Sequence, residues 1–170
     1  MVASLYRLGR LLVLTGLLSA TALTAAAQST PPRIGVGFSL IPSISEGLGL
    51  GLFGRVSSPL NSDISVAVGG SLTGFVLSGR DDASYAFDPQ LSLIITLPEQ
   101  GNQAPYVLGG VGAFVPIRAA GRQSGPTLHF GFGWVRLLNE TSGFLEINPA
   151  LVIGDADVDL VLPVRAGLIF

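Results

Sequence analysis

The sequence contains no cysteine and no lysine, and charged residues make up only 12% of its 170 positions. Without cysteine the chain has no disulfide framework, no thiol nucleophile and no cysteine-based metal site. The charged share is roughly half the usual value of about 25%, which is too low for a typical soluble helical protein. A formal net charge of −2 argues against a nucleic-acid-binding protein. The 23 glycines likewise argue against a helical fold.

The first 27 residues have the three-part layout of a secretory signal peptide. Arg7 and Arg10 precede the apolar stretch "LLVLTGLLSATALT", and small residues stand at Ala25 and Ala27. We expect cleavage after Ala27 and export through the Sec pathway, which leaves one domain, residues 28–170. A retained transmembrane helix is the alternative, but the strongly apolar part is shorter than the ~20 residues that a span needs.

Apolar residues then recur at every second position in eight runs, which are separated by clusters of Gly, Pro, Asn, Asp and Ser. In most runs one face is apolar and the other is polar or glycine. The fifth run is apolar on both faces, so its facing is ambiguous. The runs cover residues 33–40, 47–56, 63–77, 85–97, 106–117, 127–137, 143–153 and 158–170.

Such a pattern fits a sandwich, a soluble barrel or a membrane barrel. The polar faces carry too few charges to coat an exterior, but they suit a narrow lumen filled by side chains. Most runs also reach the ~9–11 residues that a tilted strand needs to cross a bilayer. The sequence therefore predicts an all-β fold: a closed, eight-stranded, antiparallel, up-and-down transmembrane β-barrel.

Three aromatic residues are expected to mark one rim of this barrel. In an up-and-down meander, Tyr106 begins the fifth run, Trp134 lies near the end of the sixth, and Phe170 ends the eighth. We expect all three to lie on the lipid-facing side of the same rim, as an aromatic girdle.

Charged side chains inside a narrow barrel should be paired, because an isolated buried charge is costly. If "GDAD" closes a tight hairpin between the seventh and eighth runs, the numbers of paired residues sum to 311 and Glu146 faces Arg165. We expect an ion pair there, with Arg55 and Asp88 as further candidates for the same lumen network. Hydrated charges without fixed partners are the alternative.

His129 is the sole histidine in the sequence. As a general base it would need a serine beside it and an orienting carboxylate. Gly131 occupies the next position on the same face, so we expect His129 to be a polar lumen residue and predict no catalytic residue.

The hairpin "GDADVD" places Asp155, Asp157 and Asp159 at the spacing of a calcium loop. The match then fails, because Leu160 stands where glycine is needed and Ala166 where glutamate is needed. We therefore predict no metal or cofactor, and treat the stretch as a solvated turn, with weak divalent-cation contact near lipopolysaccharide as the alternative.

At "PYVLGGVGAF" (105–114) the chain resembles the family of small eight-stranded outer-membrane β-barrels that includes opacity-type and porin-family proteins. The signal peptide, the eight runs and Phe170 extend the resemblance over residues 28–170. "FLEINPAL" departs from the family's common acidic-x-basic-aromatic pattern, because Asn148 and Pro149 follow Glu146. The resemblance implies the outer membrane of a Gram-negative-type bacterium and no single activity.

The ending "PVRAGLIF" adds a lipid-facing stripe of Val164, Ala166, Leu168 and Phe170. Phe170 resembles the terminal aromatic that the barrel-assembly machinery reads in this class. The expected partners are therefore this machinery during insertion, and outer-membrane lipids and lipopolysaccharide afterwards. The protein is expected to be a monomer.

We expect a structural, interaction or envelope-stability role without catalysis. One alternative is a conduit or binding barrel for small hydrophobic molecules, if Val107, Val111 and Val115 face the lumen near Val152 and Val161. A lipid-modifying enzyme that uses His129 and a soluble lipocalin-like carrier are the other two alternatives.

Overall fold

The computed structural model describes residues 31–43, 47–75, 84–99, 101–117, 124–138, 140–154 and 158–170. The expected signal peptide and two of the hairpin aspartates, Asp155 and Asp157, lie outside these residues. The chain consists of two compact units, Met1–Thr30 and Pro31–Phe170, and the described residues all belong to the second unit. No helix in the described part of the chain is long and apolar enough to cross a membrane.

The described residues form one antiparallel sheet of ten strands. The strands are β1 (Arg33–Ser43), β2 (Gly47–Pro59), β3 (Ile64–Phe75), β4 (Ser84–Thr96), β5 (Gln103–Pro116), β6 (Gly125–Leu137), β7 (Ser142–Ile147), β8 (Ala150–Ile153), β9 (Val158–Val161) and β10 (Val164–Ile169).

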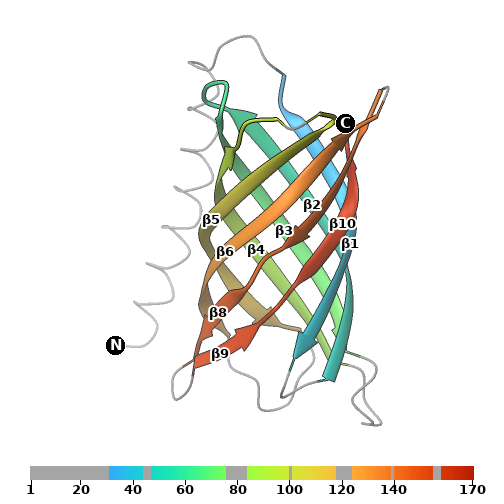
Figure 1. The fold of residues 1–170 in the computed structure, drawn as a ribbon. Helices are drawn as coiled ribbons and strands as arrows, with labels where there is room; N and C mark the ends of the chain where they lie inside the picture. The colour runs from blue at the N-terminus through green and yellow to red at the C-terminus, as the bar shows by residue number, and fades with distance from the viewer. Residues whose placement is uncertain are drawn as a thin grey trace. The chain divides into compact units, whose positions relative to one another are not determined.

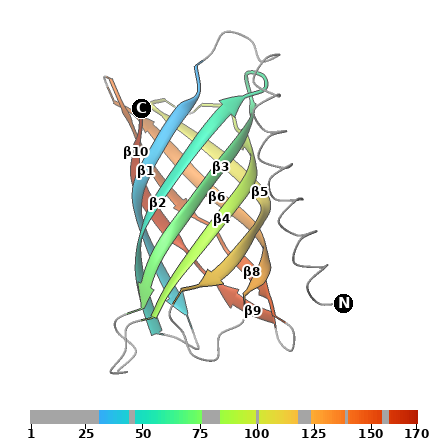
Figure 2. The same cartoon turned by 180° about the vertical axis from the view of Figure 1, so that it is seen from behind.

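Consecutive strands pair from β1 to β7, β8 pairs with β6 and β9, and β10 pairs with β7 and β1, so the sheet closes into a barrel of tilted strands (Figures 1 and 2). At the seam Phe170 and Ile34 exchange two backbone hydrogen bonds, with N···O distances of 2.9 and 3.1 Å. Closure removes the open edge that a membrane would not tolerate.

Two prolines interrupt two of the eight barrel strands, so the eight strands are divided into ten segments. Proline has no N–H to donate to a ladder, and β7 and β8 are separated at Pro149, as β9 and β10 are at Pro163. The wall continues across both breaks, because Asn148 N–H donates to the carbonyl of Pro163 at 2.9 Å. The predicted closed eight-stranded barrel is thus confirmed.

Side chains alternate between the two faces of the wall. The outward positions carry exposed Leu, Ile, Val and Phe side chains on every strand, for example Leu52, Leu91 and Phe130. The inward positions carry glycine, serine, threonine and nearly all the charges of the strands. The apolar surface of this protein therefore lies outside, which is the reverse of a soluble barrel.

The expected aromatic girdle is wrong in one member. Tyr106 is 2% exposed and points into the lumen, where its hydroxyl has a polar partner. Trp134 and Phe170 do lie on the outer face, where Phe170 is 60% exposed.

The facing of β5 also corrects the suggestion of an apolar lumen. With Tyr106 and Leu108 inside, Val107, Val111 and Val115 lie on the outer face, and Val111 is 54% exposed. The inner face of this part of β5 carries glycines and not these valines.

Candidate functional site

The centre of the lumen is a hydrogen-bonded charge network around Glu146 of β7. Arg165 of β10 lies directly opposite in the register, and its Nη1 is 3.1 Å from Glu146 Oε1. The two side chains are 0% and 1% exposed. Backbone pairing and side-chain pairing therefore coincide at this position, as the tight hairpin predicts.

The second oxygen of Glu146 is bound from the far wall. Arg55 Nη1 of β2 lies 2.7 Å from Glu146 Oε2, and the Tyr106 hydroxyl donates to the same oxygen at 2.8 Å. Arg55 Nη2 also lies 3.4 Å from the Tyr106 hydroxyl. Glu146 thus joins β2, β5, β7 and β10 across the lumen.

Asp88 and Gln90 of β4 complete the network. Arg165 Nη1 donates to Gln90 Oε1 at 3.0 Å, and Gln90 Nε2 donates to Asp88 Oδ2 at 2.6 Å. Asp88 Oδ2 lies 4.0 Å from Arg165 Nη2, at the limit of an ion pair. Two arginines and two carboxylates therefore meet, and their formal charges balance.

Aromatic rings surround the arginines of this network. The guanidinium carbon of Arg55 lies 5.2–5.7 Å from the ring centres of Phe53, Tyr106 and Phe144. The guanidinium carbon of Arg165 lies 4.3 Å from the ring centre of Phe53. Desolvated cation–π contacts add roughly 2 kcal/mol each in favourable cases, so the rings both fill the lumen and stabilise its charges.

Glycines let these large side chains meet across intervening strands. Tyr106, Gly133 and Glu146 are successive partners in the register of β5, β6 and β7. A Cβ at Gly133 would lie 2.5 Å from the tyrosine ring. Tyr106 therefore reaches Glu146 over the bare backbone of Gly133.

The same arrangement brings the histidine to a serine. Ser92, Gly110 and His129 are successive partners on β4, β5 and β6, and Ser92 Oγ lies 2.9 Å from His129 Nε2. His129 is 2% exposed, and its Nδ1 has no hydrogen-bond partner among the described residues. The pair therefore lacks the orienting carboxylate of a catalytic triad.

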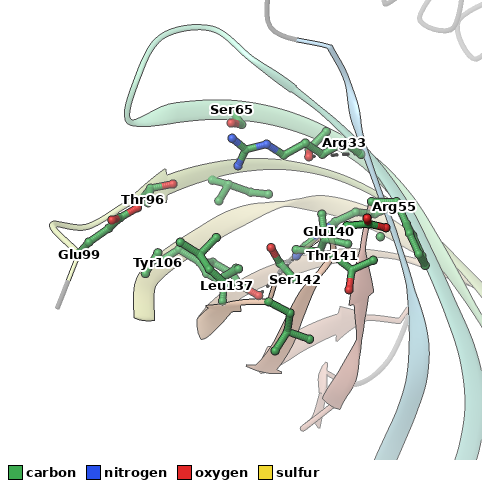
Figure 3. Close-up of a pocket in the computed structure, with 18 of the residues that line it drawn as sticks. Arg33, Arg55, Ser65, Thr96, Glu99, Tyr106, Leu137, Glu140, Thr141 and Ser142 are labelled. Atoms are coloured by element: carbon green, nitrogen blue, oxygen red, sulfur yellow. Dashed lines mark hydrogen bonds between the residues drawn. The ribbon is translucent and has the colours of Figure 1, made fainter. Parts of the chain in front are cut away.

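The network fills the middle of the lumen. The cavity beside it has a volume of about 10 Å³, which is the minimum for one water molecule. A second cavity of about 450 Å³ opens at the rim where the chain ends, with Arg33, Glu99 and Glu140 around it (Figure 3). Arg55 and Tyr106 of the network border this cavity, so it is a blind vestibule.

The structure brings together all four residues that the sequence placed in the lumen charge network, namely Glu146, Arg165, Arg55 and Asp88. Sequence reasoning missed Tyr106 and the Ser92–His129 hydrogen bond. The inward glycines opposite these side chains were the available signal, because a large residue needs a small partner across the ladder.

We expect Tyr106→Phe to lower the free energy of unfolding by about 1.5 kcal/mol, because it removes a hydrogen bond to a buried charge. Tyr85→Phe is the matched control, since Tyr85 is exposed on the outer face. Urea unfolding of the barrel in lipid vesicles measures both. Equal midpoints for the two variants would contradict the role given to the Tyr106 hydroxyl.

Comparisons with known proteins bear on the fold alone. No protein-family model and no curated protein matches the chain. Solved structures similar to it include Neisserial surface protein A (14% identity, TM-score 0.62) and the N-terminal barrel domain of OprF from Pseudomonas aeruginosa (15%, 0.53). Outer membrane protein OprG from Pseudomonas aeruginosa is a third (14%, 0.54). The alignments cover 81% of this chain and 94%, 97% and 93% of the three structures, respectively. The chain therefore has the fold of the small eight-stranded outer-membrane β-barrels.

Proposed function

We propose that this chain is an integral outer-membrane barrel with a structural or interaction role in the envelope and no transport path through its lumen. The observation that carries the proposal is the network of Glu146, Arg55 and Arg165, which spans the lumen and leaves a cavity of about 10 Å³. Solutes larger than water cannot pass this point without breaking buried ion pairs.

The outer face supports the membrane location. Large exposed apolar side chains cover the strands on all sides, whereas soluble monomers rarely expose apolar patches of more than a few hundred Å². Lipid is the environment in which such a surface is stable. The soluble lipocalin-like alternative would require this surface to face water.

A ligand-binding barrel for small hydrophobic molecules receives little support. Inward apolar residues do gather on the far side of the network, around Ile41, Phe75 and Ala86. Their cavity measures about 20 Å³, while binding pockets for organic ligands measure about 300–1,000 Å³. These side chains pack against each other as a small core.

A lipid-modifying activity at His129 is disfavoured for a similar reason. Ser92 and His129 are both buried inside the barrel, whereas the acyl chains of lipids would lie against its outer face. The hydrogen bond between them therefore serves to satisfy two buried polar groups.

Connection lengths suggest the orientation. On the side where the chain ends, the longest connection is residues 97–102, while 76–83 and 117–124 on the other side are longer. Outer-membrane barrels have their shorter turns in the periplasm. We therefore place the vestibule and Phe170 at the periplasmic rim, and expect delivery through the Sec pathway.

Membrane fractionation followed by cold and boiled SDS gels tests the proposal. A folded barrel should be found with the outer membrane, resist cold SDS and change mobility after boiling. Recovery of the protein in the soluble periplasmic fraction would refute the membrane location.

The proposed recognition by the barrel-assembly machinery makes a separate prediction. Phe170→Ala should reduce assembled barrel in cells severalfold, while barrels refolded in vitro keep their stability, because the ring is exposed and packs little. Phe38→Ala, at another exposed outer phenylalanine, is the control. Quantitative blotting of heat-modifiable protein measures both, and equal levels would contradict recognition of Phe170.

A further inference from the structure

Arg136 is the single charged side chain on the outer face of the described strands. It follows Phe132 and Trp134 on the outward positions of β6, two residues apart each time. An arginine on the lipid face is strongly destabilising at the bilayer midplane, but this cost nearly vanishes at the interface. Trp134, beside it, is of the residue type that favours the interface.

The surroundings of Arg136 leave its charge uncompensated. Its partners in the register are Gln103 on β5 and Gly143 on β7, neither of which carries a charge. Among the described residues no carboxylate forms an ion pair with Arg136. The guanidinium group and the exposed Gln103 amide thus offer hydrogen-bond donors on the lipid side of the rim.

A groove lies beside these donors. It has a volume of about 330 Å³ and is lined by Gln103, Trp134, Arg136, Gly143, Phe144 and Leu145. The groove exists because Gly143 has no side chain: a Cβ there would meet no atom closer than 4.0 Å. Polar donors at one end and Trp134 with Leu145 below them match the order of groups in a phospholipid.

We propose that this groove binds one glycerophospholipid, with Arg136 and Gln103 holding its phosphate and Trp134 and Leu145 packing against the glycerol and first acyl carbons. The inference rests on the proposed membrane location. Charge complementarity selects a phosphate-bearing lipid, because a neutral lipid would leave Arg136 unpaired. Free phosphate would match the donors but leave the apolar part of the groove empty.

Trp134 is the sole tryptophan of the chain, so its fluorescence reports on this groove directly. The experiment titrates the purified full chain in nonionic detergent with phosphatidylglycerol that carries bromine near the head of its acyl chains. Saturable quenching at about one lipid per barrel is expected. Brominated diacylglycerol should quench weakly and without saturation, and inorganic phosphate should compete poorly.

Two variants and two matched controls probe the two halves of the groove. Arg136→Gln should weaken lipid binding about fivefold or more, from the loss of about 1 kcal/mol per surface arginine. Arg33→Gln removes an arginine from the inside of the same rim and should have no effect. Gly143→Leu should fill the groove and abolish saturable quenching, while Gly54→Leu, in similarly open space on β2, should not.

Failure of this inference is distinguishable from failure of the membrane location. Each variant is first checked for heat-modifiability, which tests the barrel alone. Equal affinities of the wild-type chain and Arg136→Gln, or equal quenching by diacylglycerol, would overturn the lipid site in a barrel that is properly folded. Competition by inorganic phosphate with the affinity of the lipid would also overturn it.

Discussion

Replacing Glu146 with glutamine is expected to lower the free energy of unfolding of the barrel by about 3–5 kcal/mol, the usual cost of removing one partner of a buried ion pair. Glu146 binds Arg55 at 2.7 Å and Arg165 at 3.1 Å. The cavity beside it, of about 10 Å³, leaves too little room for water to solvate the two arginines in its place. After the change, Arg55 would lose its carboxylate partner, and Arg165 would keep Asp88 alone, at 4.0 Å.

Glu140→Gln is the matched control, because Glu140 is exposed beside the vestibule. It should change stability by no more than about 0.5 kcal/mol, as surface substitutions usually do. Urea titrations in lipid vesicles, followed by the fluorescence of Trp134, measure both variants. A loss below about 1 kcal/mol in Glu146→Gln would show that hydration, not the arginines, stabilises this carboxylate.

Adding one methyl group at Gly110 is expected to prevent folding or to cost about 3 kcal/mol, at the upper end for overpacking. The Cβ of Gly110→Ala would overlap the Leu91 carbonyl oxygen and lie 2.8 Å from His129 Nε2. The first contact is with backbone, which cannot move aside without disturbing the β4–β5 ladder. The second contact lies in the path of the hydrogen bond between His129 and Ser92.

Gly109→Ala, one position earlier, provides the control. Its Cβ would face outward and lie 3.7 Å from its nearest neighbours, the His129 carbonyl oxygen and the Phe130 ring. This variant should refold with the yield of the wild-type protein. Cold SDS gels of refolded protein give the readout, and equal yields of the two variants would contradict the spacing role of Gly110.

Part of this arrangement could be predicted because it follows from local rules. The Glu146–Arg165 pairing needs a short hairpin and the two-residue period of strands, both of which are visible in the sequence. The outward and inward faces of most strands follow from the same period. Neither inference requires knowledge of distant parts of the chain.

The remainder depends on how the sheet closes, which local patterns do not contain. β5 is apolar on both faces, so Tyr106 could be assigned to the wrong side. Arg55 meets Glu146 across the lumen, and that contact depends on the tilt and stagger of all strands together. The breaks at Pro149 and Pro163 also divide two runs that the alternation alone would continue.

The sealed lumen is tested most directly by ion current across a planar lipid bilayer that contains the refolded barrel. Heat-modifiability on SDS gels first shows that the refolded protein used for this experiment is a folded barrel. An open porin measured in parallel shows that the bilayer reports channels. With Glu146, Arg55 and Arg165 bridging the lumen, we expect no discrete current steps from the wild-type protein. Reproducible steps from the wild-type barrel would contradict a lumen closed by this network.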